Sequence, residues 1–505
     1  MEAIVDGLLT ALEPQVFSLT LLGVVLGLVM SAMPGLTTTV AVVLLLPFTF
    51  YLDAGPSMGL LMGVFVGGMT GGAMSAILVN IPGNPASVVT NIDGYPMTER
   101  GAASEALTLA FLGSFMGGAV GLILLVLIAP QLASIALAFG APEQFALVVL
   151  GLTLVAGFSE GKLLRGFIAA GVGLMIATVG MDPIAGMPRF TFGEVSMQQG
   201  ISFIPIMIGM FALPLAIEAL RSPKGQNLPP LDAPSYHPIK NLIAAVKMLP
   251  KTAICGVRSA VIGTGIGAVP GTGSAIAAVV AYECAKRFPC IRNVSFGKGN
   301  PEGIVAPEAA NSAMMGGALI PMLILGIPGD PVTAVMLGAL TIVGVNPGPL
   351  MLSQHPDVVY GLFGSFAIAL GFLLILAIVG IPLFVKAVRI PVRILMPTIV
   401  LLCLIGSFAL RNTMLDVFAM TAAGVLAYFM KRWGYPILPM LLALILGPLL
   451  ETQFRMSLII SFGDPMVFIT SPISAVLLLL ALVFVAVMVW AEIRRPKATL
   501  MVADS

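Results

Sequence analysis

The long apolar segment 304–345 is interrupted in its middle by the run Ile327-Pro328-Gly329-Asp330-Pro331. A run of the same kind, Ile81-Pro82-Gly83-Asn84-Pro85, interrupts the apolar segment 57–98. Proline lacks a backbone donor and clashes with the preceding turn, so a regular helix does not pass through either run. The backbone groups freed at such a break must face protein, water or a ligand, because hydrocarbon cannot satisfy them. We therefore predict that each segment is a discontinuous helix that crosses a membrane once.

Two further apolar segments carry a Pro-Gly pair near their middle. Met33-Pro34-Gly35 interrupts segment 16–50, and Val269-Pro270-Gly271 interrupts segment 253–288. The basic loops fall on one side of the membrane along the whole chain only if both segments begin and end on the same side. We therefore expect both to be re-entrant hairpins with the Pro-Gly pair at the tip.

The composition agrees with a membrane protein and excludes several other classes. Of the 505 residues, 58% are apolar and only 9% are charged, whereas soluble domains carry about 25% charged residues. A soluble enzyme, a disordered chain and a secreted disulfide scaffold are therefore excluded. The formal charge of +1 provides no net field for polyanions, so nucleic acid is not an expected partner. The sequence predicts an all-α polytopic protein embedded in a lipid bilayer.

Uninterrupted apolar runs between charged residues predict the other spans. They lie at 103–129, 142–158, 166–181, 200–219, 358–385, 394–410, 414–430, 435–450 and 466–491. The long polar loop near 221–258 is rich in Lys and Arg and has a single acid, Asp232, which places it in the cytoplasm. On this orientation, the basic residues expected on the outer face are Arg189, Arg411 and Arg455.

The breaks recur in the same order in the two halves of the chain. Gly27 to Gly35 matches Gly263 to Gly271, and the two Ile-Pro-Gly runs match each other. Two weaker landmarks follow: the run 111–115 resembles the run 362–366, and Pro205 and Pro214 have the same spacing as Pro439 and Pro448. This order predicts a membrane repeat at 16–220, a cytoplasmic linker at 221–252, a second repeat at 253–450 and an extra transmembrane helix at 466–491.

The second repeat should run upside down relative to the first. The first repeat contains an odd number of single crossings once its hairpin is set aside, so the chain enters the second repeat from the opposite side. Inverted repeats with paired broken helices are typical of secondary transporters, whose substrate site lies near the membrane midplane.

The breaks also indicate how an anion could be held. A helix N-terminus carries about half a positive charge and free N–H donors, and no Lys or Arg lies in the middle of a predicted span. Two half-helix termini could therefore bind a carboxylate without a basic side chain, although the same hydroxyls could simply be N-caps. The candidate substrate-binding residues are Pro34, Gly35, Thr37, Thr38, Asn84, Ser87, Pro270, Gly271, Thr272, Ser274, Gly329 and Thr333.

Oxygen-bearing side chains at the same breaks suit a coupling cation. Carboxylate and carbonyl oxygens at unwound points can bind Na⁺, and a buried carboxyl can carry H⁺. The candidate cation-coupling residues are Asn80, Gly83, Asn311, Ser312 and Asp330. Asp330 has the alternative role of a helix cap, and Glu308 either lines the same cavity or lies at the headgroup level. Asp93 and Glu99 are expected at the interface.

Signs of an enzyme are missing from the sequence. The Gly-rich stretch 265–274 has no Lys of a phosphate-binding loop, and the catalytic motifs of metalloproteases, serine hydrolases and redox dithiols are not found. We expect neither catalytic residues nor a cofactor, and no metal beyond a possible Na⁺ or H⁺ as the coupling ion.

Several runs together resemble one transporter family. They are the runs at 33–36, 46–50, 80–85, 93–96, 268–273, 299–304, 306–311 and 326–331. In combination they resemble the large membrane subunit of the tripartite tricarboxylate transporters. The resemblance implies a multi-pass protein of the bacterial inner (cytoplasmic) membrane that imports citrate or another organic carboxylate, driven by a cation gradient without ATP. It also implies a small four-helix membrane partner and a periplasmic solute-binding protein.

A passive organic-anion channel is the main alternative. Moving one charge through 100 mV is worth about 2.3 kcal/mol, so an inside-negative membrane opposes entry of a di- or trivalent anion by roughly 5–7 kcal/mol per 100 mV. Cations that move with the anion cancel this cost, whereas a channel would let the anion leak outward. A scaffold without a site and an intramembrane enzyme are weaker alternatives.

Overall fold

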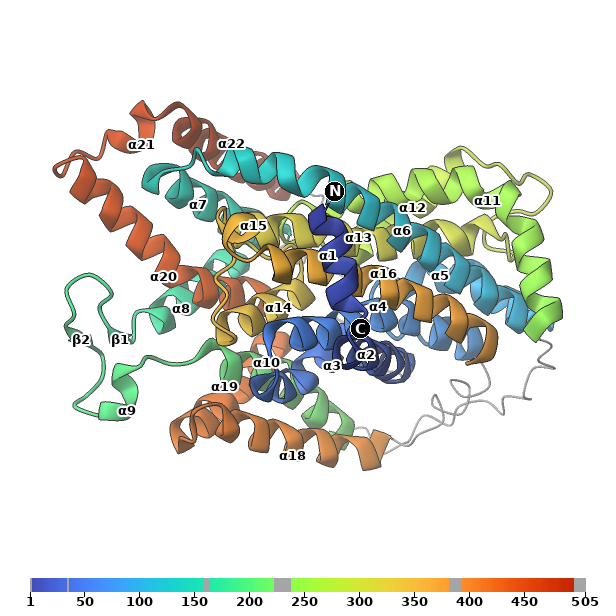
Figure 1. Ribbon diagram of the computed structural model, residues 1–505, viewed down its shortest axis with the longest axis horizontal. Coiled ribbons are helices and arrows are strands. Elements are labelled where there is room, and N and C mark those ends of the chain that lie inside the picture. The colour runs from blue at the N-terminus through green and yellow to red at the C-terminus, as the bar shows by residue number, and fades with distance from the viewer. Residues whose placement is uncertain (1, 34–35, 159–162, 222–237, 381–391, 495–505) are drawn as a thin grey trace. The chain divides into compact units, whose positions relative to one another are not determined.

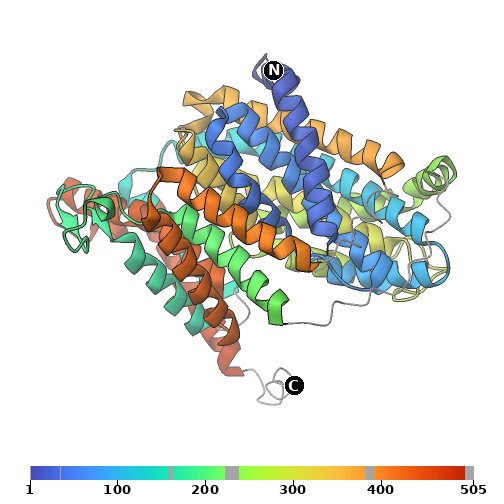
Figure 2. The ribbon, with the colours of Figure 1, turned by 90° about the horizontal axis from the view of Figure 1, so that it is seen from below.

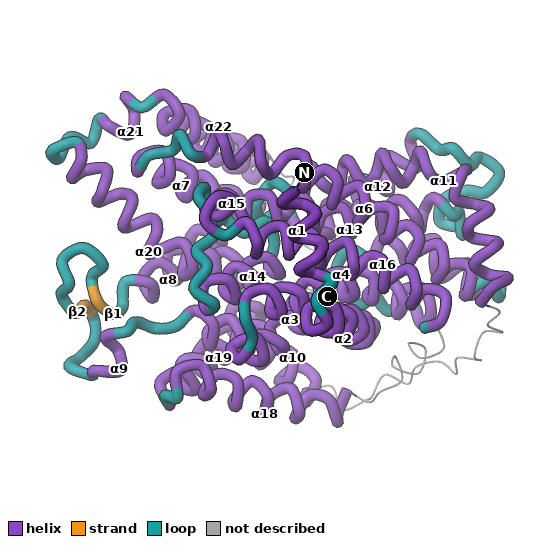
Figure 3. The backbone as a smooth tube through the Cα atoms, in the orientation of Figure 1, coloured by secondary structure: helices purple, strands orange, loops and turns teal. Residues whose placement is uncertain are grey.

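The computed structural model describes residues 2–33, 36–158, 163–221, 238–380 and 392–494. Helices make up most of these residues (Figure 3). Within the described ranges, nine helices are long and apolar enough to cross a membrane. Strands β1 (Gly180–Met181) and β2 (Pro188–Arg189) form a short antiparallel pair in which Gly180 lies opposite Arg189. The predicted all-α polytopic architecture is confirmed.

The described chain divides into two compact units. Unit 1 comprises Met1–Leu137 and Ile204–Val425, and unit 2 comprises Ala138–Phe203 and Leu426–Ser505. Each unit therefore combines segments from both halves of the chain, as the colours in Figures 1 and 2 show: unit 2 joins teal and green segments to red ones.

The helices of unit 1 include both halves of every predicted break. They are α1 (Glu2–Ala11), α2 (Pro14–Ala32), α3 (Thr38–Leu45), the 3-10 helix η1 (Leu46–Tyr51), α4 (Ala54–Val79), α5 (Ser87–Glu99), α6 (Ala103–Ala136), α10 (Phe203–Arg221), α11 (Pro238–Gly267), α12 (Gly273–Arg287), α13 (Glu302–Leu325), α14 (Pro331–Ile342), α15 (Met351–Gln354), α16 (Pro356–Val379), α18 (Val392–Arg411) and α19 (Met414–Arg432), the last of which continues across the boundary between the units.

The helices of unit 2 come from two distant stretches of the chain. They are α7 (Ala141–Phe158), α8 (Leu163–Ala177), α9 (Val195–Gln198), α20 (Ile437–Ile460), α21 (Val467–Thr470) and α22 (Pro472–Arg494). Within unit 2, α20 packs against α7 and α8, and α22 packs against α7.

All four predicted interruptions are present in the structure. Helix α2 ends before the first Pro-Gly pair and α3 begins after it, while Pro34 and Gly35 themselves lie outside the described residues. The gaps between α4 and α5, α11 and α12, and α13 and α14 contain the other three runs. The membrane sidedness that would make the two hairpins re-entrant stays a prediction.

Two boundaries differ from those expected. Helix α11 already begins at Pro238, inside the stretch assigned to the linker, and its Lys247 and Lys251 are exposed one turn apart. Charge counting cannot distinguish such an amphipathic helix from a loop, because both keep their Lys residues in solvent. The final segment contains the short α21 before α22, since Pro472 starts a new helix.

The two predicted copies have the same close helix packing within unit 1. A Cβ added at Gly27 on α2 would lie 2.4 Å from the Val64 carbonyl oxygen on α4, and a Cβ added at Gly263 on α11 would lie 2.2 Å from the Ala310 oxygen on α13. The matched runs of the sequence place Gly27 with Gly263, and Val64 with Ala310. Both copies therefore bring two helix backbones together at equivalent positions, where only glycine fits.

The two copies also interlock within unit 1. Helix α6 of the first copy packs against α13 of the second, and α16 of the second copy packs against α4 of the first. The half-helices behave in the same way, because α3 packs against α14 and α12 against α5. Each copy therefore completes the core around the other's broken helices. The inversion of one copy relative to the membrane stays a prediction.

The arginines that were expected on the outer face are all ion-paired. In unit 2, Arg189 lies 2.6 Å from the Glu451 carboxylate, and Arg455 lies 2.7 Å from that of Asp182. The backbone N–H of Ala185 and the Arg455 guanidinium hold the pKa of Asp182 well below its usual range. In unit 1, Arg411 pairs with the buried Asp416.

The close approach of α11 and α13 generates a stability prediction. We expect Gly263→Ala to destabilise the protein by about 1–3 kcal/mol, because the added methyl group forces two backbones apart. Gly265→Ala on the same helix is the matched control, since a Cβ there meets nothing within 4 Å and alanine favours a helix. Thermal unfolding of the purified variants in detergent measures the difference. Equal melting temperatures for the two variants would contradict the proposed contact.

Candidate functional site

In each copy, the Ile-Pro-Gly break packs against the Pro-Gly break. A Cβ added at Gly83 would lie 2.2 Å from the Ser31 carbonyl oxygen, and the Gly83 N–H donates to the Gly72 oxygen at 3.2 Å. In the second copy, the Gly271 N–H donates to the Gly329 oxygen at 3.0 Å. The four interruptions thus form two pairs, and the predicted residues Gly83, Gly271 and Gly329 take part through their backbones.

The side chain of the residue after each Ile-Pro-Gly triplet bonds to the residue three positions later, at the start of the next helix. Asn84 Oδ1 accepts from the Ser87 N–H at 2.9 Å and the Ser87 hydroxyl at 2.6 Å. Asp330 Oδ1 accepts from the Thr333 N–H at 2.8 Å and the Thr333 hydroxyl at 2.6 Å, which completes a capping box. The capping role considered for Asp330 is therefore confirmed, and this bonding leaves its carboxylate without a basic partner.

The two caps differ in one chemical respect. The Asn84 side chain also donates Nδ2–H to the Met69 carbonyl oxygen on α4 at 3.1 Å. An ionised carboxylate has no proton to donate, so Asp330 cannot make the equivalent bond. The second copy thus places an acid where the first copy has a neutral amide.

The hydroxyls that follow the Pro-Gly breaks have different roles. Thr37 caps α3 by accepting from the Val40 N–H at 3.4 Å, and the Thr38 hydroxyl lies 3.5 Å from that of Ser31. Thr272 instead donates to the carbonyl oxygens of the preceding turn, at 2.6 Å to Ile266 and 2.8 Å to Val269. The predicted N-cap is therefore absent at Thr272, because its hydroxyl closes the end of α11.

The second Pro-Gly break is more open than the Ile-Pro-Gly break beside it. Pro270 and Ser274 are half-buried, whereas Gly329 and Asp330 are buried. Asn80, predicted as a cation ligand, is exposed; it ends α4 with a φ of 59° and accepts from Asn91 Nδ2–H at 2.5 Å. The structure therefore places Asn80 apart from the buried candidates.

A buried polar cluster joins the two copies at the centre of unit 1. Asn311 on α13 donates Nδ2–H to the Met69 oxygen at 2.9 Å, the same oxygen that accepts from Asn84. Glu308, one turn earlier, accepts from the Thr90 hydroxyl at 2.6 Å and the Ser114 hydroxyl at 3.1 Å. We call this set the central polar cluster; its side chains are Asn84, Thr90, Ser114, Glu308, Asn311 and Ser312.

The central polar cluster holds Glu308 inside the protein. The side chain is fully buried, while its depth in the membrane, at the headgroup level or beside Asn311 and Ser312 in a shared cavity, stays a prediction. Among the described residues, no Lys, Arg or His forms an ion pair with Glu308. Asn311 Oδ1 and Ser312 Oγ are buried and have no hydrogen-bond partner in the described structure. The cluster therefore has spare oxygen atoms and no basic group.

Asp93 has a role that sequence reasoning missed. Its Oδ1 accepts from the backbone N–H groups of Gly297, Gly299 and Asn300 at 2.7–2.9 Å, and its Oδ2 accepts from the Tyr282 hydroxyl at 2.9 Å. Asp93 is fully buried in the protein, and its expected position at the membrane interface stays a prediction. A carboxylate of the first copy thus holds the loop before α13 in the second copy.

Two side chains of the second copy stabilise the same loop. Glu302 Oε2 accepts from the N–H groups of Cys290 and Ile291 at 2.9 and 2.8 Å, and Asn300 donates to the Ile291 and Val294 oxygens. The runs 93–96 and 299–304 were already noted as distinctive. Their spacing along the chain, however, carries no signal that Asp93 meets Asn300.

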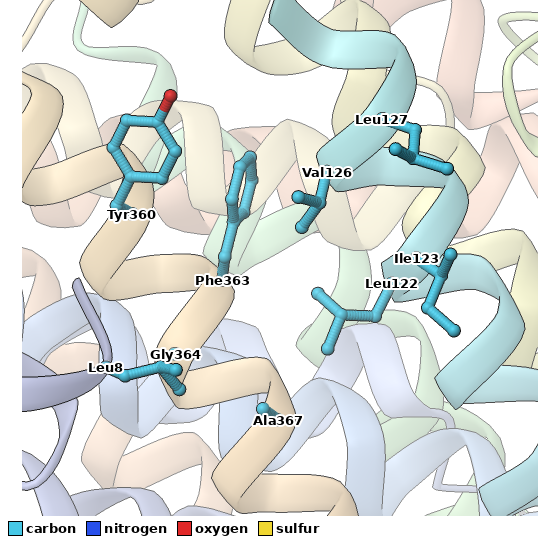
Figure 4. A pocket seen from close by; sticks show the side chains of 9 residues that line it. All are labelled: Leu8, Leu122, Ile123, Val126, Leu127, Tyr360, Phe363, Gly364 and Ala367. Carbon is cyan, nitrogen blue, oxygen red and sulfur yellow. The ribbon is translucent and has the colours of Figure 1, made fainter. Parts of the chain in front are cut away.

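An apolar pocket in unit 1 lies between α1, α6 and α16 (Figure 4). Leu8, Leu122, Phe363 and their neighbours line it, and the Tyr360 hydroxyl is the polar side-chain atom among its lining residues. Its lining residues include no charged side chain. This pocket is therefore unsuited to the chemistry of the breaks.

The contacts of Asp93 generate a prediction about the loop. We expect Asp93→Ala to free residues 289–301, because three N–H groups and one hydroxyl lose their acceptor. Cys255 is buried in a cluster with Ala285 and Ala306, against which Phe296 of the loop packs. Its labelling by a maleimide should therefore rise at least several-fold when Cys284 and Cys290 have been replaced by Ser.

The exposed Glu99 on the same helix is the matched control. Glu99→Ala should leave the labelling of Cys255 unchanged. If Asp93→Ala also leaves it unchanged, Asp93 does not hold the loop.

Comparisons with known proteins agree with this architecture. The chain is 37% identical over 498 residues to a 52.8 kDa protein of the TAR-I ttuC′ 3′ region of Agrobacterium vitis, covering 99% of this chain and 98% of that protein. It is 39% identical over 243 residues to a protein of the TAR-II ttuC′ 3′ region of the same organism, covering 48% of this chain and all of that protein. No solved structure matches the chain. Residues 17–442 match the model of the tripartite tricarboxylate transporter TctA family, and the chain therefore belongs to this family of large transporter subunits.

Proposed function

We propose that this protein is the translocation subunit of a binding-protein-dependent secondary transporter that imports di- or tricarboxylates across the bacterial inner membrane. The single observation that carries the proposal is the pairing of four helix breaks within unit 1, in a chain of the TctA family. Its partners would be a small four-helix membrane subunit and a periplasmic solute-binding protein, since the family belongs to a tripartite system.

The anion would be held by backbone amides and hydroxyls at the breaks. Among the described residues, no Lys or Arg side chain is buried, so a buried carboxylate substrate has no basic side chain available there. Helix N-termini provide N–H donors and a favourable dipole instead. We therefore retain the predicted substrate residues as the proposed site, with the hydroxyls of Thr37, Thr38, Thr272 and Ser274 following the Pro-Gly breaks.

A coupling cation would compensate the negative charge of the substrate. Without it, the membrane potential opposes entry by the roughly 5–7 kcal/mol per 100 mV given above for a di- or trivalent anion. Asp330, Asn311, Ser312 and the backbone of Gly83 are buried and provide oxygen atoms, which supports their proposed role in cation binding. Asn80 is exposed and has less support.

Uptake by the reconstituted three-part system tests this proposal. Proteoliposomes that contain both membrane subunits receive the binding protein and a panel of labelled carboxylates, with or without a Na⁺ or a pH gradient. We expect concentrative uptake that an ionophore abolishes. Uptake that stops at equal concentrations on both sides would instead support the passive channel.

Asp330 can be tested without loss of its cap. We expect Asp330→Asn to remain folded, because Asn84 makes the same two bonds to Ser87 in the first copy, while cation-driven accumulation falls by about tenfold or more. Asp330→Ala is the comparison, since it loses the cap as well, at a cost of about 1 kcal/mol. Full accumulation by Asp330→Asn together with reduced stability of Asp330→Ala would show that Asp330 is only a cap.

A further inference from the structure

Glu308 lies at the point where the two copies meet. The carboxylate is on α13 of the second copy, and its two hydrogen-bond donors, Thr90 on α5 and Ser114 on α6, belong to the first. Glu308, Asn311 and Ser312 share one face of α13, because residues three and four apart are neighbours on a helix. The free oxygens of Asn311 and Ser312 are therefore presented on the same face as the carboxylate.

The position in the first copy that is equivalent to Glu308 carries no acid. The matched Ile-Pro-Gly runs place Met62 on α4 opposite Glu308 on α13, and the matched runs 111–115 and 362–366 place Ser365 opposite Ser114. Helix α4 packs against α16 as α13 packs against α6. In the described structure, Met62 is fully buried and the buried Ser365 hydroxyl has no hydrogen-bond partner. The fold therefore does not need a carboxylate at this crossing.

Other ionisable groups near α13 are engaged elsewhere or lie away from the carboxylate. Asp93 on α5 and Tyr282 on α12 bind each other, and Arg258 on α11 donates to the Phe288 oxygen and the Cys255 sulfur. Helices α4 and α14 carry no ionisable side chain. The remaining groups on the packed helices whose side chains are described lie toward helix ends or in exposed stretches; they are Tyr95, Glu99, Glu105, Lys247, Lys251, Glu283, Cys284, Lys286, Arg287 and Glu302.

A carboxylate buried in this way must be neutralised. An isolated charge in a low-dielectric interior is strongly unfavourable unless it is paired, and two hydroxyl donors carry no net charge. A monovalent cation, either H⁺ or Na⁺, removes the charge. The free oxygens of Asn311 and Ser312 would complete an all-oxygen set around Na⁺.

We propose that Glu308 is the binding group for one monovalent coupling cation, at a site that the two copies build together. Thr90 and Ser114 orient the carboxylate from the first copy, while Asn311 and Ser312 add oxygen ligands from the second. This proposal rests on the proposed transport function, and it adds a cation site at a crossing between copies to the one proposed at the helix break of Asp330. Binding of the cation would then change the charge at a contact between the interlocked helices of unit 1.

Infrared difference spectroscopy on the purified protein in nanodiscs tests the site without transport. A step in pH, or addition of Na⁺, should change a carboxyl band in the wild-type protein, and Glu308→Gln should remove that band change. Ser114→Ala should alter the cation affinity by about tenfold, the value of one hydrogen bond to a charged group. The matched control Ser365→Ala should leave the cation affinity unchanged, because the equivalent position in the first copy, Met62, has no carboxylate.

The pH step and the addition of Na⁺ also distinguish H⁺ from Na⁺ as the bound cation. A band change with pH alone identifies H⁺, and one that requires Na⁺ at constant pH identifies Na⁺. An identical response in wild type and Glu308→Gln, or equal effects of Ser114→Ala and Ser365→Ala, would overturn the proposal. Glu308→Asp keeps a carboxyl group and should retain the band change. It therefore serves as a control for the effect of changing the side chain at this position.

Transport by the three-part system then separates this proposal from the broader one. Glu308→Gln should lose gradient-driven accumulation by about tenfold or more while still exchanging internal for external substrate. If the wild type shows no cation-driven uptake, the proposed function fails, whereas the infrared result still decides whether Glu308 binds a cation. Full accumulation by Glu308→Gln would overturn the assignment of coupling to Glu308.

Discussion

The backbone groups freed at a helix break must find their partners within the protein, and this constraint shapes unit 1. Hydrocarbon offers no hydrogen bonds, so each helix break has to be closed by neighbouring backbone or side chains. The structure does this with two pairs of breaks, such as the bond from the Gly271 N–H to the Gly329 oxygen, and with one capping residue after each Ile-Pro-Gly triplet, Asn84 or Asp330. The broken helices are therefore held in place without a single buried basic side chain among the described residues.

The two copies satisfy the backbone groups at their breaks in the same way but differ in the ionisable side chains nearby. Glycines at equivalent positions let α2 approach α4 and α11 approach α13, and the caps at Asn84 and Asp330 have the same bonds. The ionisable side chains differ, however: Glu308 and Asp330 of the second copy replace Met62 and Asn84 of the first, while the buried Asp93 of the first copy holds the loop before α13. The shared features serve the fold, so the acidic differences are the natural place for function. Under the coupling role proposed for Glu308, such an asymmetry would add a cation-responsive element without altering the packing that both copies need.

Contacts between the copies matter as much as those within them. The first copy's Asp93 holds the loop before α13, and its Thr90 and Ser114 bind Glu308 on the same helix. Helix α13 therefore depends on the first copy at both its beginning and its middle. A change in the charge of Glu308 would act on the α5–α6–α13 contact, which joins the halves of the chain.

The sequence by itself determined the membrane class, the positions of the four breaks and the order of the duplicated landmarks. These follow from local properties: apolar length, proline's missing donor, and repetition of short runs. It also marked Asp330 and Asn311 as buried polar candidates, since polar residues within apolar segments stand out. Only the tertiary structure decided that Asp93 is a buried acceptor for the 297–300 backbone and that Glu308 bonds to Thr90 and Ser114. Those contacts join residues about 200 positions apart, and no periodicity or spacing encodes which distant helices pack together.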